Sequence, residues 1–334
     1  MIKTRLTERL RIQHPVVLGG MASGTNVDLV VAVSEAGGLG ILGVTSFSPE
    51  QIREAVAEIR SRTKRPFGLN LLIAFTSEAQ LEACLAARVP VLSTAWGDPQ
   101  RHAARAREVG VPWMHMVQRA SDAGEAARLG AAAVVAQGHE GGGHVGLVST
   151  MPLVPAAADA IAREVPEAAQ RPALVAAGGI ADGRGLVAAL SLGADGVLLG
   201  TRFLATPEAP FSPAAKEAIC AASEADTVCS TIPDLVSNPR WTQIGALARA
   251  LKTRAVLEWQ GREAELRTLS DDDRKALAAR WATARTEGRI EETSVLAGED
   301  SGLIHEVLPA EEVVNRTVAE AAALLGRMGG FLLP

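Results

Sequence analysis

From residue 15 to about residue 206, the chain alternates regularly between two kinds of segment. Short apolar runs of four to seven residues are each followed by ten to fifteen residues rich in Ala, Glu and Arg. Continuous apolar runs are typical of strands that are buried on both faces of a parallel sheet. The pattern predicts eight strands, at residues 16–19, 38–42, 67–73, 89–95, 111–117, 132–137, 173–177 and 196–200.

The segments between these runs carry signals for helices. Ser48 followed by Pro49 predicts a helix start, with Ser48 as N-cap and Pro49 at the first helical position. Ser121-Asp122 predicts a second start, and Gly130 its end. Eight strand–helix units of this length favour a (β/α)8 TIM barrel, an α/β fold, over a doubly wound open sheet.

The alternation ends near Pro207, where residues 207–213 hold three prolines. We therefore predict a helical subdomain at residues 207–287, inserted late in a barrel that is formed by residues 1–206 and 288–334. The predicted helices of the subdomain are 214–224, 242–259 and 271–287, and a last helix at 310–328 follows it.

The chain is poor in aromatic residues, with six Phe, five Trp and no Tyr among 334 residues. The core must therefore be aliphatic and rich in Ala, and no phenol is available as a proton donor. So few rings argue against an all-β fold and against stacking platforms for single-stranded nucleic acid. The net charge of −5 and the absence of a basic block indicate neither a nucleic-acid partner nor a membrane-surface partner.

The cysteines and the N-terminus bear on the compartment. The three cysteines lack CxxC spacing, so they indicate neither a disulfide framework nor a zinc site, and no cluster has metal-ligand spacing. The N-terminus is charged where a signal peptide is apolar, and no apolar run approaches the ~18 residues of a membrane span. We expect a soluble, cytoplasmic protein.

In a barrel, ligands bind at the carboxyl ends of the strands. Gly178-Gly179 and Gly200-Thr201 follow the last two predicted strands, each just before a predicted helix. Exposed backbone N–H groups beside the positive end of a helix dipole bind phosphate. A single glycine there would indicate only a turn, but two such pairs on adjacent strands favour a phosphate site.

The sixth strand runs into the glycine-rich segment QGHEGGGHVG, residues 137–146. Its glycines would let the backbone approach a flat ligand closely. His144 lies among them, and an imidazole can act as a base near neutral pH. The alternative reading is a histidine that only caps the loop.

Four other side chains are candidates at the barrel mouth. Asn70 lies in an apolar run and needs a polar partner, which a bound ligand would supply. Trp96 ends the fourth strand and is the main aromatic candidate, whereas the other Trp residues are expected to pack in the helical part. For His115, on the fifth strand, structural and functional readings stay open, and His139 could equally be solvated.

These motifs together resemble the FMN-dependent nitronate monooxygenase family, formerly called 2-nitropropane dioxygenases. The resemblance covers nearly the whole chain and rests on GGMA at 19–22, FGLNLL at 67–72, QGHEGGGHVG at 137–146 and the run from AAGGIADGRG to LLGTRF at 176–203. The last two motifs also occur in flavin-dependent enoyl-[acyl-carrier-protein] reductases and NAD(P)H:quinone reductases. They therefore indicate fold and cofactor better than substrate.

The resemblance implies an FMN that lies across the barrel mouth. The residues that it assigns to FMN are Gly20, Met21, Ala22, Asn70 and Gln137 around the ring system, and Gly178, Gly179, Gly200 and Thr201 at the phosphate. Gly142 and Gly143 are further cofactor-binding candidates. It makes His144 the catalytic residue. It implies a homodimer by analogy alone, and no metal.

The activity implied is the oxidation of an alkyl nitronate by O2 to a carbonyl compound and nitrite, through one-electron transfer to the flavin. The alternative is an NAD(P)H-dependent flavin reductase of the quinone or enoyl-acyl type. A third class is a non-redox phosphate-binding barrel, such as an isomerase.

Three features depart from the relatives. Some relatives carry a His-Lys pair on the fifth strand, where this chain has His115-Met116 and lacks the positive charge. The segment IAFTSEAQ after the third strand is shorter than in the quinone reductases, which weakens the nicotinamide-dependent reading. Gly141 and Gly142 stand where Ala is common, and we expect this difference to change little.

Overall fold

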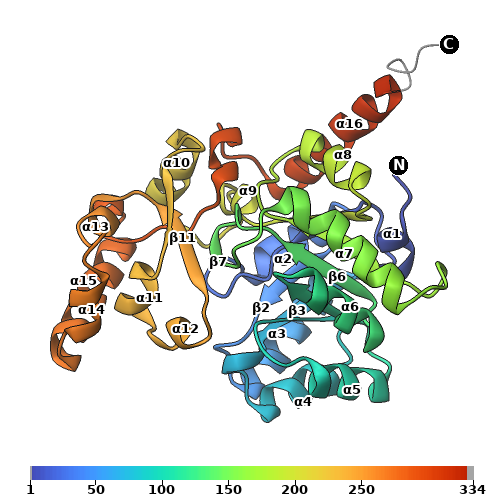
Figure 1. The fold of residues 1–334 in the computed structure, drawn as a ribbon, viewed down its shortest axis with the longest axis horizontal. Helices are drawn as coiled ribbons and strands as arrows, with labels where there is room; N and C mark the ends of the chain where they lie inside the picture. Colours follow the sequence, from blue (N-terminus) through green and yellow to red (C-terminus); the bar gives the residue numbers. More distant parts are fainter. Residues whose placement is uncertain (1, 329–334) are drawn as a thin grey trace.

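Eight parallel strands form the centre of the protein in a computed structural model that describes residues 2–328 (Figure 1). Their order around the sheet is β1-β9-β8-β6-β5-β4-β3-β2, and a parallel bridge between Val17 and Leu39 joins the two edges. This arrangement is a TIM barrel, and each of the eight predicted strands is present. The strands are β1 (Val16–Leu18), β2 (Gly40–Gly43), β3 (Phe67–Leu72), β4 (Val91–Ala95), β5 (Trp113–Val117), β6 (Ala133–Gln137), β8 (Ala173–Ala177) and β9 (Gly196–Leu199).

The core consists of two layers of aliphatic side chains, one outside the strands and one inside the barrel, as the composition predicts. The outer layer lies between the strands and the surrounding helices, and it includes Leu69 and Val134. The inner layer includes Ile41 and Val175, and Leu6 from helix α1 (Arg5–Leu10) joins it. The barrel interior is thus a packed core.

Helices surround the barrel at the places the sequence predicts. Ser48 caps α3 (Pro49–Arg62) through a capping box with Gln51, which confirms the predicted start. Helix α6 (Ala120–Arg128) begins before Ser121-Asp122, so that predicted start is wrong; Arg119 is the N-cap. The other outer helices are α2 (Val27–Glu35), α4 (Glu78–Ala86), α5 (Gln100–Val109), α7 (Thr150–Glu164), α8 (Gly183–Ser191) and α16 (Ala310–Met328), which packs on α8 and α2.

Residues 207–287 are not purely helical. Helices α10 (Pro213–Ala221) and α15 (Asp271–Thr286) match two predictions, but the third predicted helix, 242–259, is wrong. That stretch holds α12 (Arg240–Gln243), strand β11 (Leu247–Leu251) and α13 (Arg254–Leu257). Its Ala and Leu residues favour a helix locally, and pairing with distant strands overrides that preference.

Strand β11 is the centre of a second, antiparallel sheet. It pairs with β10 (Thr227–Ser230) on one side and with β7 (Gly143–Val145) on the other. Because β7 is part of the glycine-rich segment after β6, this small sheet joins residues 207–287 to the barrel mouth. The division into a barrel of 1–206 with 288–334 and a subdomain of 207–287 stays a prediction. Helices α11 (Ile232–Ser237) and α14 (Glu263–Thr268) complete this part of the chain, at the left of Figure 1.

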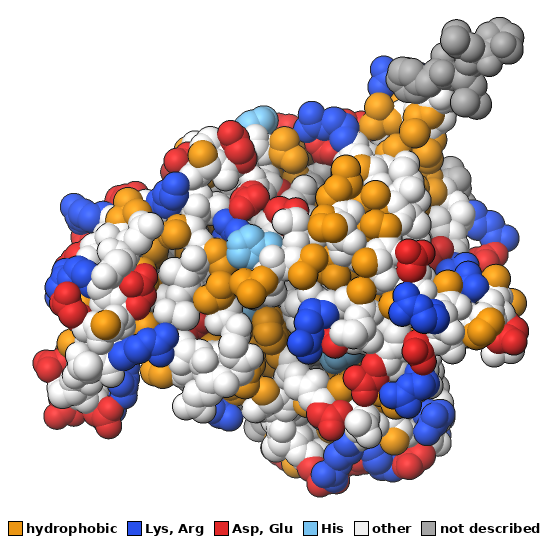
Figure 2. Space-filling model, in the orientation of Figure 1, with side chains coloured by type: hydrophobic (Ala, Val, Ile, Leu, Met, Phe, Trp, Pro, Cys, Tyr) orange, Lys and Arg blue, Asp and Glu red, His pale blue; other side chains and the backbone are white. Residues whose placement is uncertain are grey.

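On the face drawn in Figure 2, acidic and basic side chains are interspersed. Among residues 2–328, no helix combines the length and the apolar character that a membrane crossing needs.

Candidate active site

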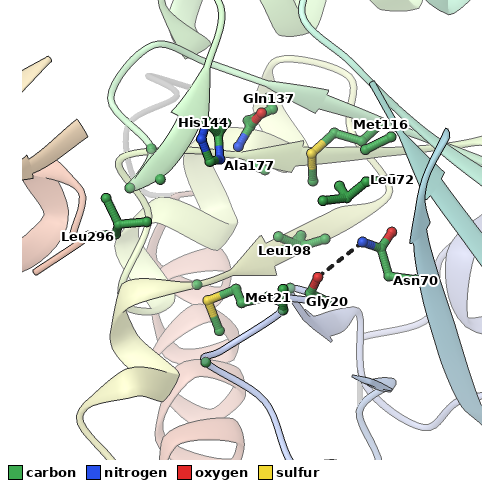
Figure 3. A pocket seen from close by; sticks show the side chains of 18 of the residues that line it. Gly20, Met21, Asn70, Leu72, Met116, Gln137, His144, Ala177, Leu198 and Leu296 are labelled. Atoms are coloured by element: carbon green, nitrogen blue, oxygen red, sulfur yellow. Dashed lines mark hydrogen bonds between the residues drawn. The ribbon is translucent and has the colours of Figure 1, made fainter. Parts of the chain in front are cut away.

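A cavity of about 540 Å³ lies at the carboxyl ends of the barrel strands (Figure 3). This volume is typical of pockets that bind small organic ligands. Every residue that the sequence analysis assigned to FMN or to catalysis lines it. These are Gly20, Met21, Ala22, Asn70, Gln137, Gly142, Gly143, His144, Gly178, Gly179, Gly200 and Thr201. The structure thus brings the set together, while the role of each member stays a prediction.

Asn70 and Gly20 form one wall of the pocket. The Asn70 side chain donates a hydrogen bond of 3.0 Å to the Gly20 carbonyl (Figure 3). It also accepts one of 2.9 Å from Ser93 Oγ. A Cβ atom at Gly20 would lie 2.4 Å from Asn70 Cβ, so only glycine allows this approach. The protein therefore already supplies two polar partners of Asn70, and a contact between Asn70 and a ligand stays a prediction.

The pocket is also lined by the glycines after β8 and β9, and β9 is the neighbour of β1 in the barrel. Gly178 and Gly179 have φ values of +95° and +72°, a region that favours glycine. The backbone N–H groups of Gly179 and Gly200 donate to no backbone acceptor in the described part of the chain. A Cβ at Gly200 would meet only Met21 Sδ, at 3.6 Å, so this position opens onto the pocket. These features suit an anionic group.

The positive end of helix α8 is not available to such a group. Asp182 Oδ1 accepts the backbone N–H bonds of Arg184 and Gly185, and Glu320 accepts that of Gly183 at 2.9 Å. The helix dipole that the sequence analysis invoked after Gly178-Gly179 is thus already balanced by two carboxylates. The turn at Gly178-Gly179 and the backbone at Gly200-Thr201 remain as donors.

A buried carboxyl group also borders the pocket. Asp300, in the 3-10 helix η3 (Glu299–Leu303), lines the pocket, and burial raises its pKa to about 7. Thr201 Oγ1 accepts a hydrogen bond of 3.0 Å from the backbone N–H of Gly298 in the same loop. Asp300 was not predicted from the sequence, in which its only signal is an acidic residue between glycines.

His144 is held on three sides by residues 207–287. It lies on β7, opposite Ala248 of β11. Its Nε2 atom is 2.8 Å from Asp234 Oδ1 of helix α11, and its ring stacks on Trp241 with a centroid distance of 3.5 Å. Because it is paired in a strand and lines the pocket, His144 is not merely a loop cap. Neither Asp234 nor Trp241 was predicted from the sequence as a pocket residue.

Aromatic side chains gather at the pocket although the chain has few. Trp241 makes edge contacts with Phe75 at 4.6 Å and with Trp96 at 5.7 Å between ring centroids. With Phe211, four of the eleven aromatic side chains of the sequence line the pocket. Trp96 reaches the barrel mouth as predicted, and Trp241 from residues 207–287 lines the same pocket. Arg240 lies over the Phe75 ring at 4.8 Å.

The other two histidine candidates do not line the pocket. His115 is buried, with Nδ1 2.8 Å from Thr94 Oγ1 and its ring stacked on Trp113, and burial lowers its pKa to about 4. This environment favours the structural reading. His139 Nδ1 lies 2.7 Å from the Gly146 carbonyl and braces the glycine-rich segment. Met116, in the place of the lysine of some relatives, does line the pocket.

A buried arginine ties the glycine-rich segment to the second sheet. Arg249 of β11 donates to the His139 carbonyl at 3.2 Å and to Thr227 Oγ1 at 3.0 Å. It also forms an ion pair of 2.9 Å with Glu299, whose backbone N–H donates to the Glu140 carbonyl. The segment that leads into the strand of His144 is therefore held at two consecutive backbone carbonyls.

Comparison with known families settles the membership of this chain. A family model described as nitronate monooxygenase matches residues 3–83 and 73–320. The chain belongs to the nitronate monooxygenase family. It is an oxidoreductase of this flavoenzyme family, as the motifs around the pocket indicated.

Similar proteins carry more than one activity in their names. A (3aS,4S,5R,7aS)-5-hydroxy-7a-methyl-1-oxo-octahydro-1H-indene-4-carboxyl-CoA dehydrogenase of Mycobacterium tuberculosis is 38% identical over 235 residues. The match covers 70% of this chain and 64% of that relative, so the chain spans less than two thirds of its length. A probable nitronate monooxygenase of Staphylococcus aureus is 28% identical, over 95% of this chain and 96% of the relative.

Solved structures support the same family. FabK from Thermotoga maritima superposes with a TM-score of 0.86 at 34% identity, covering 99% of this chain and 100% of the other. Nitroalkane oxidase from Streptomyces ansochromogenes gives a TM-score of 0.80 at 26% identity, covering 97% and 100%. These likenesses extend over the whole fold, including residues 207–287.

Proposed function

We propose that this protein is an FMN-dependent nitronate monooxygenase, which oxidises alkyl nitronates with O2 to carbonyl compounds and nitrite. The observation that carries the proposal is the position of His144. It lines a pocket bordered by glycine backbone, and Asp234 is hydrogen-bonded to its ring. A histidine held in this way can pair with an anionic substrate and can accept a proton from a neutral one.

The pocket fits FMN. Glycine positions with open Cβ directions border it: a Cβ at Gly143 would meet only Leu296 Cδ1, at 4.0 Å, and one at Gly200 only Met21 Sδ. The donors at Gly178-Gly179 and Gly200-Thr201 suit the phosphate, and Gly20, Met21, Ala22, Asn70 and Gln137 would contact the ring system. When bound, FMN would supply the redox chemistry, taking electrons from the nitronate and giving them to O2.

The side chains of the protein have separate tasks in this reaction. His144 holds the nitronate through a hydrogen bond to its negatively charged nitro group. When the substrate is a neutral nitroalkane, His144 accepts the proton from the α-carbon. Trp96 and Trp241 make a wall of the same pocket and exclude water from the bound substrate.

A second candidate is a dehydrogenase or reductase that exchanges hydride with a carbon substrate or a nicotinamide. The 38% identity to the CoA-thioester dehydrogenase, against 28% to the probable nitronate monooxygenase, favours it. The glycine-lined pocket would serve either chemistry, since both need the same cofactor site. The two candidates differ in the electron donor that reduces the flavin.

Anaerobic mixing separates them. In one stopped-flow experiment the flavin-loaded protein is mixed with propionate-3-nitronate, and in a second it is mixed with NADH or NADPH. The absorbance of the flavin is followed in both. We expect rapid bleaching by the nitronate and slow or no bleaching by the nicotinamides. Rapid bleaching by NADH together with no response to the nitronate would overturn the proposal in favour of the second candidate. Purified protein that carries no flavin and binds none would remove both.

A further inference from the structure

We propose that Asp234 is a positioning residue, which fixes the proton of the His144 ring on Nε2 and so makes Nδ1 the atom that acts on substrate. This inference rests on the proposed function for the identity of the substrate. Its geometric part, the assignment of the two ring nitrogens, does not depend on the substrate.

The hydrogen bond between the two residues sets the tautomer. His144 Nε2 lies 2.8 Å from Asp234 Oδ1, and Asp234 is only 3% exposed. An ionised carboxylate can only accept hydrogen bonds. The proton therefore lies on Nε2, which leaves the lone pair of the neutral ring on Nδ1.

The Asp234 side chain makes one hydrogen bond in the described part of the chain, the bond to His144 Nε2. Its second oxygen, Oδ2, is buried and has no hydrogen-bond partner in the described part of the chain. A buried, partly unpaired carboxylate costs stability, because it loses hydration without full compensation. Such a costly group beside a pocket histidine is characteristic of functional sites.

Nδ1 is free to reach a ligand. It has no hydrogen-bond partner in the described residues and, unlike Asp234 Oδ2, it is not among the buried unpaired atoms. Trp241 stacks at an interplanar angle of 11°, which covers a ring face and leaves the ring edge open. His144 lines the pocket, as Figure 3 shows, so Nδ1 is the ring nitrogen left for the substrate.

The role of His144 Nδ1 differs between the neutral nitroalkane and its anion, the nitronate. With a neutral nitroalkane, the α-C–H bond breaks, its electron pair moves into the nitro group to form the nitronate, and the proton goes to Nδ1. The ring then carries a positive charge, which the Asp234 carboxylate stabilises. With a preformed nitronate no proton is removed from carbon, and the ring binds the anion in its protonated form, in which Nδ1–H donates the hydrogen bond.

The test compares Asp234→Asn with the wild type on nitroethane and on ethylnitronate, using FMN-loaded enzyme. We expect kcat/KM for nitroethane to fall by roughly 100-fold, a loss typical of an impaired general base. For ethylnitronate we expect less than a tenfold loss. Asp195→Asn is the matched control, since Asp195 is also a largely buried carboxylate but bonds to Arg5 and Leu174 N, away from the pocket. Equal losses on both substrates would overturn the proposal.

A spectroscopic readout tests the ring directly. In wild-type protein labelled with 15N-histidine, at a pH where imidazole is neutral, we expect His144 to show a protonated Nε2 and an unprotonated Nδ1. A protonated Nδ1 in the neutral wild-type ring would overturn the assignment, whether or not the variant folds. If the wild type turns over neither nitro compound, the proposed function fails, and the 15N result still decides the role of Asp234.

Discussion

His144 and Asp234 are 90 positions apart in the sequence, and their side chains meet at 2.8 Å between Nε2 and Oδ1. His144 lies on a strand that leaves the barrel mouth, and Asp234 on a helix of the 207–287 segment. The barrel supplies the pocket floor, while that segment sets the orientation of the pocket histidine. The catalytic proposal therefore depends on both parts of the chain.

We predict that His144→Ala keeps its flavin and loses most nitronate turnover. The substitution removes the imidazole without disturbing the strand, because His144 contributes to β7 through its backbone. We expect kcat/KM for propionate-3-nitronate to fall by roughly 10²- to 10³-fold, the usual cost of removing one hydrogen-bond donor to a negatively charged group. Steady-state nitrite release measures the loss, and the flavin spectrum measures cofactor content. His305→Ala, at an exposed histidine, is the control and should behave like the wild type. Wild-type kcat/KM in His144→Ala would remove the residue from its proposed role.

We predict that Gly200→Val weakens FMN binding and leaves the fold intact. Gly200 has a negative φ of −111°, and the space that a side chain would enter belongs to the pocket. We expect the Kd for FMN to rise roughly tenfold or more, as a clash of 1.4 kcal/mol would produce. Fluorescence titration of the apoprotein gives the Kd. Riboflavin, which lacks the phosphate, should be affected less.

Gly326→Val is the matched control for Gly200→Val. Gly326 also has open space around its Cβ direction but lies on the outer helix α16. The phosphate assignment would be wrong if riboflavin and FMN lost the same affinity.

We predict that Asp300→Asn stabilises the apoprotein at high pH and not at low pH. Burial raises the pKa of Asp300 from 3.8 to about 7, so between these values the folded protein binds more protons than the unfolded chain. Stability therefore falls as pH rises through this window, by on the order of 4 kcal/mol at most. Asparagine mimics the neutral carboxyl and removes the loss.

Denaturant unfolding at pH values below and above this window measures the difference between Asp300→Asn and wild type. Asp271→Asn, at an exposed side chain, is the control and should show no such dependence. A difference in unfolding free energy that stays constant with pH would contradict the assignment of the loss to Asp300.

We predict that Gly142→Ala is destabilising and Gly141→Ala is close to neutral. A Cβ at Gly142 would lie 2.6 Å from the backbone of Ala297 and Gly298, which cannot yield as a flexible side chain does. At Gly141 the nearest atom is Val145 Cγ1 at 3.3 Å. Gly141 and Gly142 stand where Ala is common in the relatives, and we expected this difference to change little. The contacts at Gly142 correct that expectation for this position.

We expect a loss of about 1–3 kcal/mol for Gly142→Ala, the usual cost of overpacking, measured by chemical denaturation. Equal stability of the two variants would show that the loop at 297–298 moves away without cost.

Local signals in the sequence determined the barrel and the composition of its mouth. Continuous apolar runs need burial on both faces, which only a covered parallel sheet provides, so all eight strands could be predicted. The glycines after β1, β6, β8 and β9 lie at strand ends, and barrel geometry brings strand ends together. For that reason every predicted binding residue lines one pocket.

The tertiary structure alone decided the second sheet and the partners of His144. The segment LARAL at 247–251 favours a helix locally, and it is a strand because β7 and β10 pair with it on either side. Asp234 and Trp241 lie in a part of the chain that reads as ordinary helix and loop. Nothing in their local sequence shows that they reach His144, because contacts between residues far apart in the chain depend on how the elements pack.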